Sequence, residues 1–529
     1  MSEHSNNTEN LQKLIDIGIA LSKEKNINIL LEKILNEARV ISNSDGGTVY
    51  LITDDSQKLN FEIMQTESLG IKFGGSSEPV PDYIYPVKLY MDDGNKNLNN
   101  VSAVCALTAK TINIKNAYEN NEYDFSGVKG FDKKHNYFSK SFLNIPLKDH
   151  KEKVIGVLQL LNAQKDGEIV SFSDELVTLV EALSSQASVA LTNQLLIDEQ
   201  KALFRAFIKL VVDALDKKDP VTGGHCNRVP LITMMIADYV NSDANDKYKD
   251  ISFSEDQMDE LFVAAWLHDF GKVATPDHIM NKSTKLQGVY DKIDQIKLRF
   301  EILKRDIEIE FYKQQIKDSN IEQQPFQSKL QKIRDDFLFL EKSNLGGEFM
   351  SDDLQEKVRE IAKYKISIDD NSKPILSDKD VDFLTISKGT LSKEDRQIME
   401  DHVLLSYELL DKLPYPEHLK EVPYIAGCHH EKLNGEGYPN GYSGDQLPLQ
   451  ARIIAIADVF EGLTAPDRPY KEPYKLSKAL NILKFMVNDG EIDPDLFHLL
   501  ITKKLYLKYA NEHLNANQID SIDEEKLLS

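Results

Sequence analysis

The chain has 529 residues, of which 41% are hydrophobic and 28% are charged, as is typical of globular proteins with packed cores. This length is enough for two or three domains of about 100–200 residues each. The formal net charge of −23 argues against a nucleic acid polymer as partner, because nonspecific binding of such polymers depends on clustered lysine and arginine. A small anionic substrate is still possible, because a metal site and a few basic side chains can reverse the field locally.

The sequence shows no signal for a membrane or for export. No run of about 18 uninterrupted apolar residues occurs, so we expect no membrane-spanning helix. The N-terminal stretch MSEHSNNTEN is polar and lacks the basic and apolar parts of an export signal. The three cysteines, Cys105, Cys226 and Cys428, are too far apart for a metal motif or a disulfide framework. We therefore expect a cytoplasmic protein.

The first part of the chain predicts a small α+β domain over residues 11–195. Residues 11–41 carry apolar side chains at three- and four-residue spacing, which predicts helix with a break near residues 25–28. The segments GGTVYLITD and LNFEIMQ are typical of strands. SFLNIPL and KVIGVLQLLN, separated by KDHKE, predict a β-hairpin before a closing helix.

A long connecting helix is predicted over residues 173–218. Its apolar stripe comprises Leu176, Leu179, Val180, Leu183, Ala187, Ala190 and Leu191, and continues past Leu195 toward Leu203 and Phe207. Such a helix could form a dimer seam that also transmits a signal. The alternative is an amphipathic connector packed on its own domain. We favour the dimerising role and expect a homodimer.

The rest of the chain predicts helices, and one section is unusually charged. The stretches KIDQIKLRFEILKRDIEIEFYKQQIKD and SKLQKIRDDFLFLEK are separated by DSNIEQQPFQ. Two charged helical stretches with a polar break predict a helical hairpin that projects from the main body.

Five of the twelve histidines and two aspartates lie in contexts that suggest a metal site. They are His225 in TGGHCNRV, His268 and Asp269 in AAWLHDFGKV, His402 in RQIMEDHVLLSYELL, His429 and His430 after YIAGC, and Asp458 in ARIIAIADVFEGL. Each one alone is more simply a hydrogen-bonded core residue. Together they supply the mixture of imidazole nitrogen and carboxylate oxygen that divalent transition metals accept, and a helical bundle can direct them inward.

The order and setting of these residues, with HDFGKV, HHEKLNGEGYP and LPLQARIIAIADVFEGLTAPDRPYK, resemble the HD-GYP family. This is a subgroup of the HD-domain metal-dependent phosphohydrolases, whose members hydrolyse cyclic di-GMP at a centre of two, sometimes three, iron or manganese ions. The resemblance implies an all-α HD-domain helical bundle, which we assign to residues 202–515. The expected fold is thus multidomain, with an α+β domain, a connecting helix and a helical bundle.

Carried over by position, the resemblance implies two divalent metal ions, with iron or manganese expected although nickel and zinc accept the same ligands. One ion would be held by His225, His268, Asp269 and Asp458, and the other by His402, His429 and His430, with Asp269 bridging. The ions would activate a water for attack on phosphorus. Lys272 would contact the scissile phosphate, Gly437, Tyr438 and Pro439 would shape the substrate pocket, and Arg468 and Lys471 would bind phosphate. Arg228 is left open between a phosphate contact and a buttress of the fold.

The sequence departs from the family pattern at two places that change the expectation. Family members with a third metal carry a glutamate four residues before the first histidine, where this chain has Val221, so we predict two metals. His268 and His402 are 134 positions apart, much farther than is common in the family. Residues of about 285–388 are therefore predicted to be an insertion, which could cover the active site, contact a partner or decorate the surface.

Residues 11–195 resemble a GAF domain, on their layout and on segments such as SFLNIPLKDHKEKVIGVLQLLNA. In cyclic-nucleotide-binding GAF domains, Asn-Lys is often followed by Phe and Asp-Glu. Here Asn162 precedes Ala163, and Phe172 precedes Asp174 and Glu175, so the lysine is missing and the spacing is shorter. The small-molecule ligand of this domain is therefore unknown, and a purely dimerising role is the alternative. For Cys105 a redox or haem-linked role is possible, but an ordinary buried thiol is favoured.

Taken together, the resemblance implies hydrolysis of cyclic di-GMP to pGpG and/or GMP by two-metal activated water, regulated by the GAF-like domain. Two alternatives are left open. One is a phosphohydrolase for another cyclic or linear nucleotide, because the metal centre does not select the substrate. The other is a non-catalytic cyclic di-GMP receptor, which is disfavoured because a receptor has no need of seven metal ligands.

Overall fold

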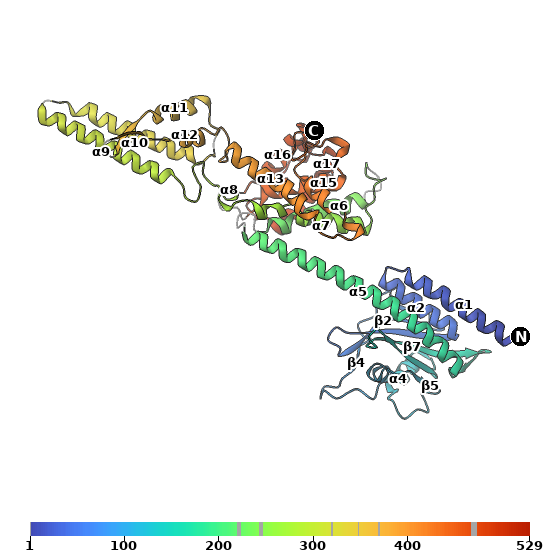
Figure 1. Cartoon of the computed structure of the whole chain (residues 1–529). Coiled ribbons are helices and arrows are strands. Elements are labelled where there is room, and N and C mark those ends of the chain that lie inside the picture. Colours follow the sequence, from blue (N-terminus) through green and yellow to red (C-terminus); the bar gives the residue numbers. More distant parts are fainter. Residues whose placement is uncertain are drawn as a thin grey trace. The chain divides into compact units, whose positions relative to one another are not determined.

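The computed structural model describes residues 2–218, 224–242, 247–318, 321–347, 349–368, 371–466 and 473–529. The chain forms two compact units, Met1–Phe204 and Arg205–Ser529 (Figure 1). The boundary between the units falls within one 45-residue helix, α5 (Asp174–Lys218). No helix in the described ranges has the length and apolar character needed to cross a membrane.

The first unit is built on one antiparallel sheet with strand order β3-β2-β1-β7-β6-β5. The strands are β1 (Ser44–Ile52), β2 (Lys58–Thr66), β3 (Ile71–Gly74), β5 (Ile112–Ile114), β6 (Phe142–Lys148) and β7 (Val154–Lys165), with β4 (Val87–Lys88) beside β2 and β8 (Glu168–Val170) beside β7. The predicted hairpin is formed by β6 and β7, in which Ile145 pairs with Leu158. The α+β prediction for this part of the chain is confirmed.

Helices cover both faces of this sheet. On one face, α1 (Ser2–Ser22), α2 (Ile27–Ser42) and the first part of α5 share a core with the strands, in which Leu35, Ile145 and Leu183 are fully buried or nearly so (Figure 1). The predicted break between the first two helices is present, because the Asn26 side chain accepts hydrogen bonds from the first turn of α2. On the other face, α3 (Val101–Thr108) contacts β6 and β7, and α4 (Ser126–His135) follows later in the chain.

The residues compared with the cyclic-nucleotide pattern have structural roles in this unit. Asn162 adopts a left-handed backbone with φ of 53°, and its side-chain oxygen accepts hydrogen bonds from the backbone of Lys140 and Ser141. Phe172 is buried in the core beside α5. Cys105 is fully buried, and burial raises the pKa of its thiol, so it behaves as the ordinary buried thiol favoured from the sequence.

The predicted apolar stripe of α5 packs on the first unit, and the helix carries a second, exposed apolar set of which only Leu203 belonged to the prediction. Val180, Leu183 and Leu191 are fully buried in the core of the first unit, as expected for a helix packed on its own domain. A second set of apolar side chains is exposed by 48–72% and recurs every seven residues: Val189, Leu196, Leu203 and Leu210. A seven-residue apolar repeat is typical of a helix that pairs with another helix.

The second unit contains a helical bundle, as predicted. Its helices are α6 (His225–Ser242), α7 (Glu255–Leu267), α8 (Asp277–Met280), α13 (Lys393–Leu410), α14 (Val422–Gly427), α15 (Leu449–Thr464), α16 (Leu476–Asn488), α17 (Pro494–Thr502), α18 (Leu505–His513) and α19 (Glu524–Leu528), with a short 3-10 turn, η1 (Phe270–Ala274), after α7. Helix α6 packs on α7 and α15, and α13 packs on η1 and α14. These contacts bring helices from both ends of the unit together.

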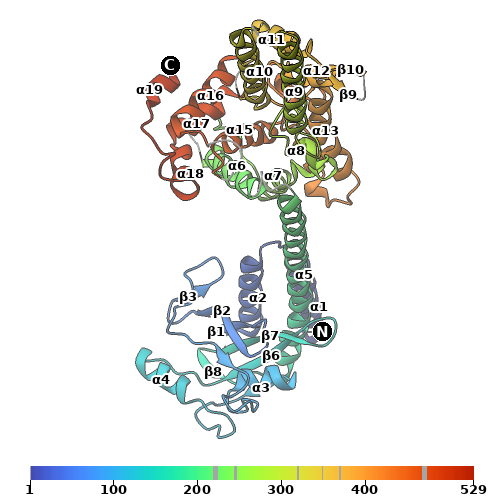
Figure 2. The same ribbon diagram turned by 90° about the vertical axis from the view of Figure 1, so that its left-hand side faces the viewer.

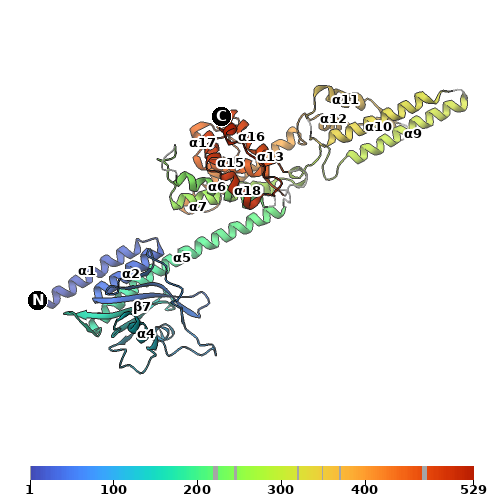
Figure 3. The same cartoon turned by 180° about the vertical axis from the view of Figure 1, so that it is seen from behind.

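Between α8 and α13 the chain forms a segment with a hydrophobic core of its own. Helices α9 (Ile293–Lys317) and α10 (Gln323–Asn344) run side by side as the predicted helical hairpin, with α11 (Asp352–Ala362) and α12 (Asp378–Leu384) beside them (Figures 1, 2 and 3). A small hairpin of β9 (Lys365–Ile368) and β10 (Asn371–Pro374) follows α11. Residues from every part of the segment meet in its core, including Phe300, Leu340 and Leu384.

Candidate metal centre

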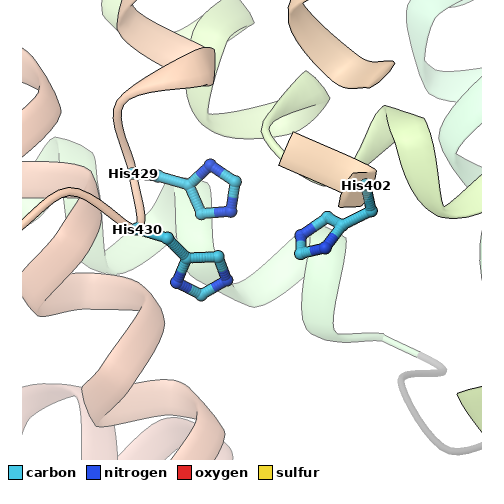
Figure 4. Close-up of side chains that lie close together, drawn as sticks. All are labelled: His402, His429 and His430. Carbon is cyan, nitrogen blue, oxygen red and sulfur yellow. The ribbon is translucent and has the colours of Figure 1, made fainter. Parts of the chain in front are cut away.

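The seven predicted metal ligands lie together in the helical bundle. They come from the start of α6 (His225), the two residues directly after α7 (His268 and Asp269), the middle of α13 (His402), the loop after α14 (His429 and His430) and the middle of α15 (Asp458). Six of them have side chains exposed by no more than 14%, and His430 is the most open at 29%. Figure 4 shows the rings of His402, His429 and His430 turned toward a common space.

The carboxylate of Asp269 lies between two groups of imidazoles. Its Oδ1 atom is 3.2 Å from Nε2 of His402 and 3.9 Å from Nε2 of His429. Its Oδ2 atom is 3.5 Å from Nε2 of His225 and 3.4 Å from Nε2 of His268. One oxygen therefore faces each group, which is the geometry needed for a carboxylate that bridges two cations.

Asp458 also faces both groups, although the sequence placed it with the first one. Its Oδ1 atom is 3.1 Å from Nε2 of His225 and 3.9 Å from Nε2 of His268. Its Oδ2 atom is 4.0 Å from Nδ1 of His430, which belongs to the second group. The two carboxylates thus lie among five imidazoles, which come from helices α6 and α13, the end of α7 and the loop after α14.

Backbone carbonyl groups orient three of the rings. Nδ1 of His268, His402 and His429 lies 2.8, 2.5 and 2.6 Å from the carbonyl oxygen of the residue three positions earlier. A proton on Nδ1 can donate to that oxygen, so the lone pair lies on Nε2 and points into the site. In the described part of the chain these three buried Nε2 atoms have no hydrogen-bond partner. Since buried polar atoms are nearly always paired, their arrangement fits a metal ion.

The pKa shifts of His429, His430 and Asp269 also fit a cation. Burial and the neighbouring His430 ring hold the pKa of His429 well below its ordinary value, and burial lowers the pKa of His430 to about 4. Both rings are therefore neutral near pH 7 and can offer lone pairs. Burial acts to raise the pKa of Asp269, but the Lys272 ammonium and the His268 ring outweigh it and hold that pKa well below its ordinary range.

Comparison with known proteins agrees with this geometry. Two HD-domain family models match residues 222–334 and 381–496, and the GAF-domain family model matches residues 26–191. The chain carries a GAF domain followed by an HD domain. The segments matched by the HD-domain models contain all seven of the proposed ligands, and residues 335–380 lie between them.

Proteins similar to the HD domain are named as phosphodiesterases of cyclic dinucleotides. The chain is 38% identical over 113 residues to the 3'3'-cGAMP-specific phosphodiesterase 3 of Vibrio cholerae, which is 21% of this chain and 23% of that protein. It is also 38% identical over 102 residues to the cyclic di-GMP phosphodiesterase response regulator RpfG of Xanthomonas campestris, covering 19% of this chain and 26% of that protein. The matched segments thus span about a quarter of the length of each of these relatives.

Lys272 reaches the centre of the HD domain by a route that the sequence did not predict. Helix α7 ends at Leu267, so Lys272 does not share a helical face with His268. The 3-10 turn η1 carries Lys272 back instead, and its Nζ atom lies 2.6 Å from Oδ2 of Asp269. Gly271 lets this turn pack closely on α13, because a Cβ there would lie 1.9 Å from the carbonyl oxygen of His402.

The Gly-Tyr-Pro turn lies beside the paired histidines, as predicted. The ring of Tyr438 packs on the ring of His430 with centroids 4.9 Å apart. Gly437 has no room for a side chain, because a Cβ there would lie 2.4 Å from the backbone nitrogen of Lys432. Buried Glu431, which the sequence did not single out, accepts hydrogen bonds from the backbone of Asn440 at 2.7 Å and of Tyr442 at 3.0 Å. Glu431 therefore fixes the turn that contains Pro439.

Glu461 is a second buried carboxylate of the HD domain that the sequence did not single out. It lies three residues after Asp458 on α15 and contacts Nδ1 of His225. Its other oxygen accepts a hydrogen bond of 2.7 Å from Nε of Arg228, a contact that favours the buttress role left open for this arginine. A second acidic residue on the same face of an apolar helix was the available signal. Arg468, Lys471 and Val221 lie outside the described residues.

Proposed function

We propose that the HD domain hydrolyses a cyclic dinucleotide at a centre of two divalent metal ions, with cyclic di-GMP as the expected substrate. The observation that carries this proposal is the position of Asp269, with one carboxylate oxygen facing each of two imidazole groups. The names of the relatives support the substrate class. Products would be pGpG and/or GMP.

In this proposal His225, His268, Asp269 and Asp458 hold one metal ion, and His402, His429 and His430 hold the other, with Asp269 shared. Imidazole and carboxylate ligands suit iron or manganese, which are the ions we propose. Bound divalent ions supply Lewis-acid polarisation of the phosphate and an activated water at neutral pH. The contribution of the protein is to hold the imidazoles and carboxylates in place before the substrate arrives.

The basic and aromatic residues around the centre would position the substrate. The Lys272 side chain is 18% exposed and its ammonium already lies at Asp269, so a small rotation would let it donate to a phosphate oxygen. Tyr438 covers one side of His430, the most exposed of the five histidines, and marks the side from which a substrate would enter. Gly437 and Pro439 would shape the pocket there, and we assign Arg468 and Lys471 to the phosphates.

The test is hydrolysis by the purified full chain, loaded anaerobically with Fe(II) or Mn(II) under reducing conditions. Cyclic di-GMP, 3'3'-cGAMP and the linear dinucleotide pGpG are supplied separately, and products are separated by chromatography. We expect cyclic di-GMP to be converted and the Asp269→Asn variant to be inactive. If another nucleotide is hydrolysed faster than cyclic di-GMP, that nucleotide replaces cyclic di-GMP as the proposed substrate. Binding of cyclic di-GMP without turnover by the metal-loaded protein would favour the receptor alternative and refute the proposed activity.

The dimer and the sensor role are further parts of the proposal, together with the cytoplasmic location expected from the sequence. The exposed seven-residue repeat of α5 supports a homodimer in which this helix pairs with its copy. The GAF domain would bind a small molecule, still unidentified, and change the packing of α5. Deleting residues 1–195 should alter activity or its regulation, and identical kinetics with and without them would remove the sensor role.

We also propose that residues of about 285–388 are an insertion in the HD domain. The separate core of this segment supports the proposal, and the gap between the two HD-domain matches supports it for residues 335–380. A buried lysine anchors the segment at the points where it begins and ends. Nζ of Lys285 donates to the carbonyl oxygens of Leu384 and Ile386 at 3.2 and 2.8 Å, and the residue is only 1% exposed.

A further inference from the structure

One histidine of the centre is oriented differently from the three that use carbonyl oxygens. His268, His402 and His429 each present Nδ1 to a backbone carbonyl three residues earlier. His225 is the first residue of α6, and its Nδ1 meets the carboxylate of Glu461 instead. A carboxylate partner orients the ring and makes the opposite nitrogen a stronger electron donor than a neutral carbonyl does.

Glu461 is held so firmly that it acts as a fixed charge behind the site. Its side chain is completely buried, on the helix that also carries Asp458. Both of its oxygens are engaged, one by His225 and the other by Arg228, so rotation of the carboxylate would leave a buried charge unpaired. The same helix therefore supplies a carboxylate that faces the metal position and a carboxylate that supports its histidine.

The negative charge around the two proposed metal positions is consequently unequal. Around His225 and His268 lie the shared Asp269, the Oδ1 atom of Asp458 at 3.1 Å from His225, and Glu461 behind the ring. Around His402 and His429 the near carboxylate oxygen is Oδ1 of Asp269, and Oδ2 of Asp458 is 4.0 Å from His430. Positive charge lies on this side too, with Lys272 Nζ 2.6 Å from Oδ2 of Asp269 and Arg228 paired with Glu461. The features that favour a divalent cation at the first position are therefore the additional carboxylate oxygen of Asp458 close to His225 and the ring orientation that Glu461 provides.

We infer that Glu461 is a positioning residue that makes the His225–His268 position the tighter of the two metal positions. The inference rests on the proposed two-metal centre but not on the identity of the substrate. Loss of a carboxylate that supports a metal-bound histidine typically weakens metal binding by about 10–100-fold. The effect should fall on one of the two binding steps and spare the other.

The experiment titrates Mn(II) into the metal-free full chain without nucleotide and follows binding by competition with a fluorescent chelator and by electron paramagnetic resonance. We expect two steps in the unaltered protein, with the spectrum of an isolated Mn(II) ion after the first. Glu461→Gln keeps the size and an oxygen acceptor but removes the charge. It should weaken the tighter step about 10–100-fold and leave the weaker one unchanged.

Two further variants make the result decisive. Glu260→Gln is the matched control, because Glu260 is a buried carboxylate of the same unit that accepts a hydrogen bond from the backbone of Glu421 and touches no histidine of the centre. It should leave both steps unchanged. His430→Ala removes a partly exposed ligand of the other position and should abolish the weaker step while the tighter one remains, a result that tests the assignment even if Glu461→Gln does not fold.

The inference is overturned if Glu461→Gln affects both steps equally or neither, if His430→Ala removes the tighter step, or if the unaltered chain binds a single Mn(II) ion. Failure of the proposed activity would look different. A protein that binds two Mn(II) ions in unequal steps but hydrolyses no cyclic dinucleotide would refute the proposed function and leave the role of Glu461 intact.

Discussion

Replacement of Asp269 by asparagine is the sharpest test of the centre, because it keeps the size of the side chain and removes its charge. Four imidazole nitrogens lie 3.2–3.9 Å from the oxygens of Asp269, so cations bound to those nitrogens would lie within about 4 Å of the carboxylate. At that distance and an effective dielectric constant of about 20, one pair of unit charges interacts by about 4 kcal/mol. That energy corresponds to about a thousandfold in affinity.

We therefore expect Asp269→Asn to bind each metal ion about a thousandfold more weakly and to lose turnover. The assay is metal content by mass spectrometry after dialysis, a chelator competition for each ion, and hydrolysis at saturating metal. Glu260→Gln again serves as the buried-carboxylate control and should keep both ions. If Asp269→Asn retained both ions with unchanged affinity, the bridging geometry would have no energetic meaning and the argument for the centre would fail.

Three further predictions concern other parts of the chain. Burial lowers the pKa of Lys285 to about 8 from 10.5, so between these values the unfolded chain binds more protons and stability rises with pH. We therefore expect the free energy of unfolding, measured with urea, to rise between pH 8 and 10.5 by up to about 3 kcal/mol more in the unaltered protein than in the Lys285→Met variant. The same pH dependence in both proteins would contradict this prediction. Leu203→Glu places a charge in the exposed repeat of α5 and should halve the molecular mass measured by light scattering. The control Lys201→Glu should leave the mass unchanged. If the unaltered protein is already a monomer, the proposed dimer is excluded. Glu431→Gln should raise KM about tenfold without changing metal content, because one charge-assisted hydrogen bond to the Gly-Tyr-Pro turn is lost; an unchanged KM would show that the turn does not need it.

The clustering of the seven proposed ligands could be predicted from the sequence because their order and setting together resemble the HD-GYP pattern. An HD dipeptide after an apolar helix, a histidine pair before Gly-Tyr-Pro and an aspartate inside an apolar helix are each recognisable without knowing the tertiary structure. That these residues lie close together in space followed from the expectation of a helical bundle. The helical hairpin of α9 and α10 was predictable for a similar reason, since two charged helical stretches and a polar break lie next to each other in the chain.

The supporting residues could not be predicted, because their roles depend on partners far away in sequence. Glu461 is 236 positions from His225, which it orients, and the sequence around either residue gives no indication of the other as its partner. Glu431 lies in a polar stretch of the sequence, and nothing in that stretch indicates that it is buried under the turn that it holds. The position of Lys272 depended on where α7 ends, and helix ends are the least certain part of a sequence-based assignment.

The long separation between His268 and His402 is compatible with an intact centre because the two histidines are connected through the bundle and not through the intervening segment. The backbone of Gly271, three residues after His268, donates a hydrogen bond of 2.7 Å to the hydroxyl of Ser406, one turn after His402 on α13. The Gly271 position admits no side chain, so η1 and α13 touch backbone to backbone. At the other end of α13, Ser392 caps the helix and Asp395, its capping-box partner, pairs with Lys282 at 2.6 Å, just before the segment begins. Both fixed points of α13 thus lie outside residues 293–384, and the length of that segment can vary without moving His402.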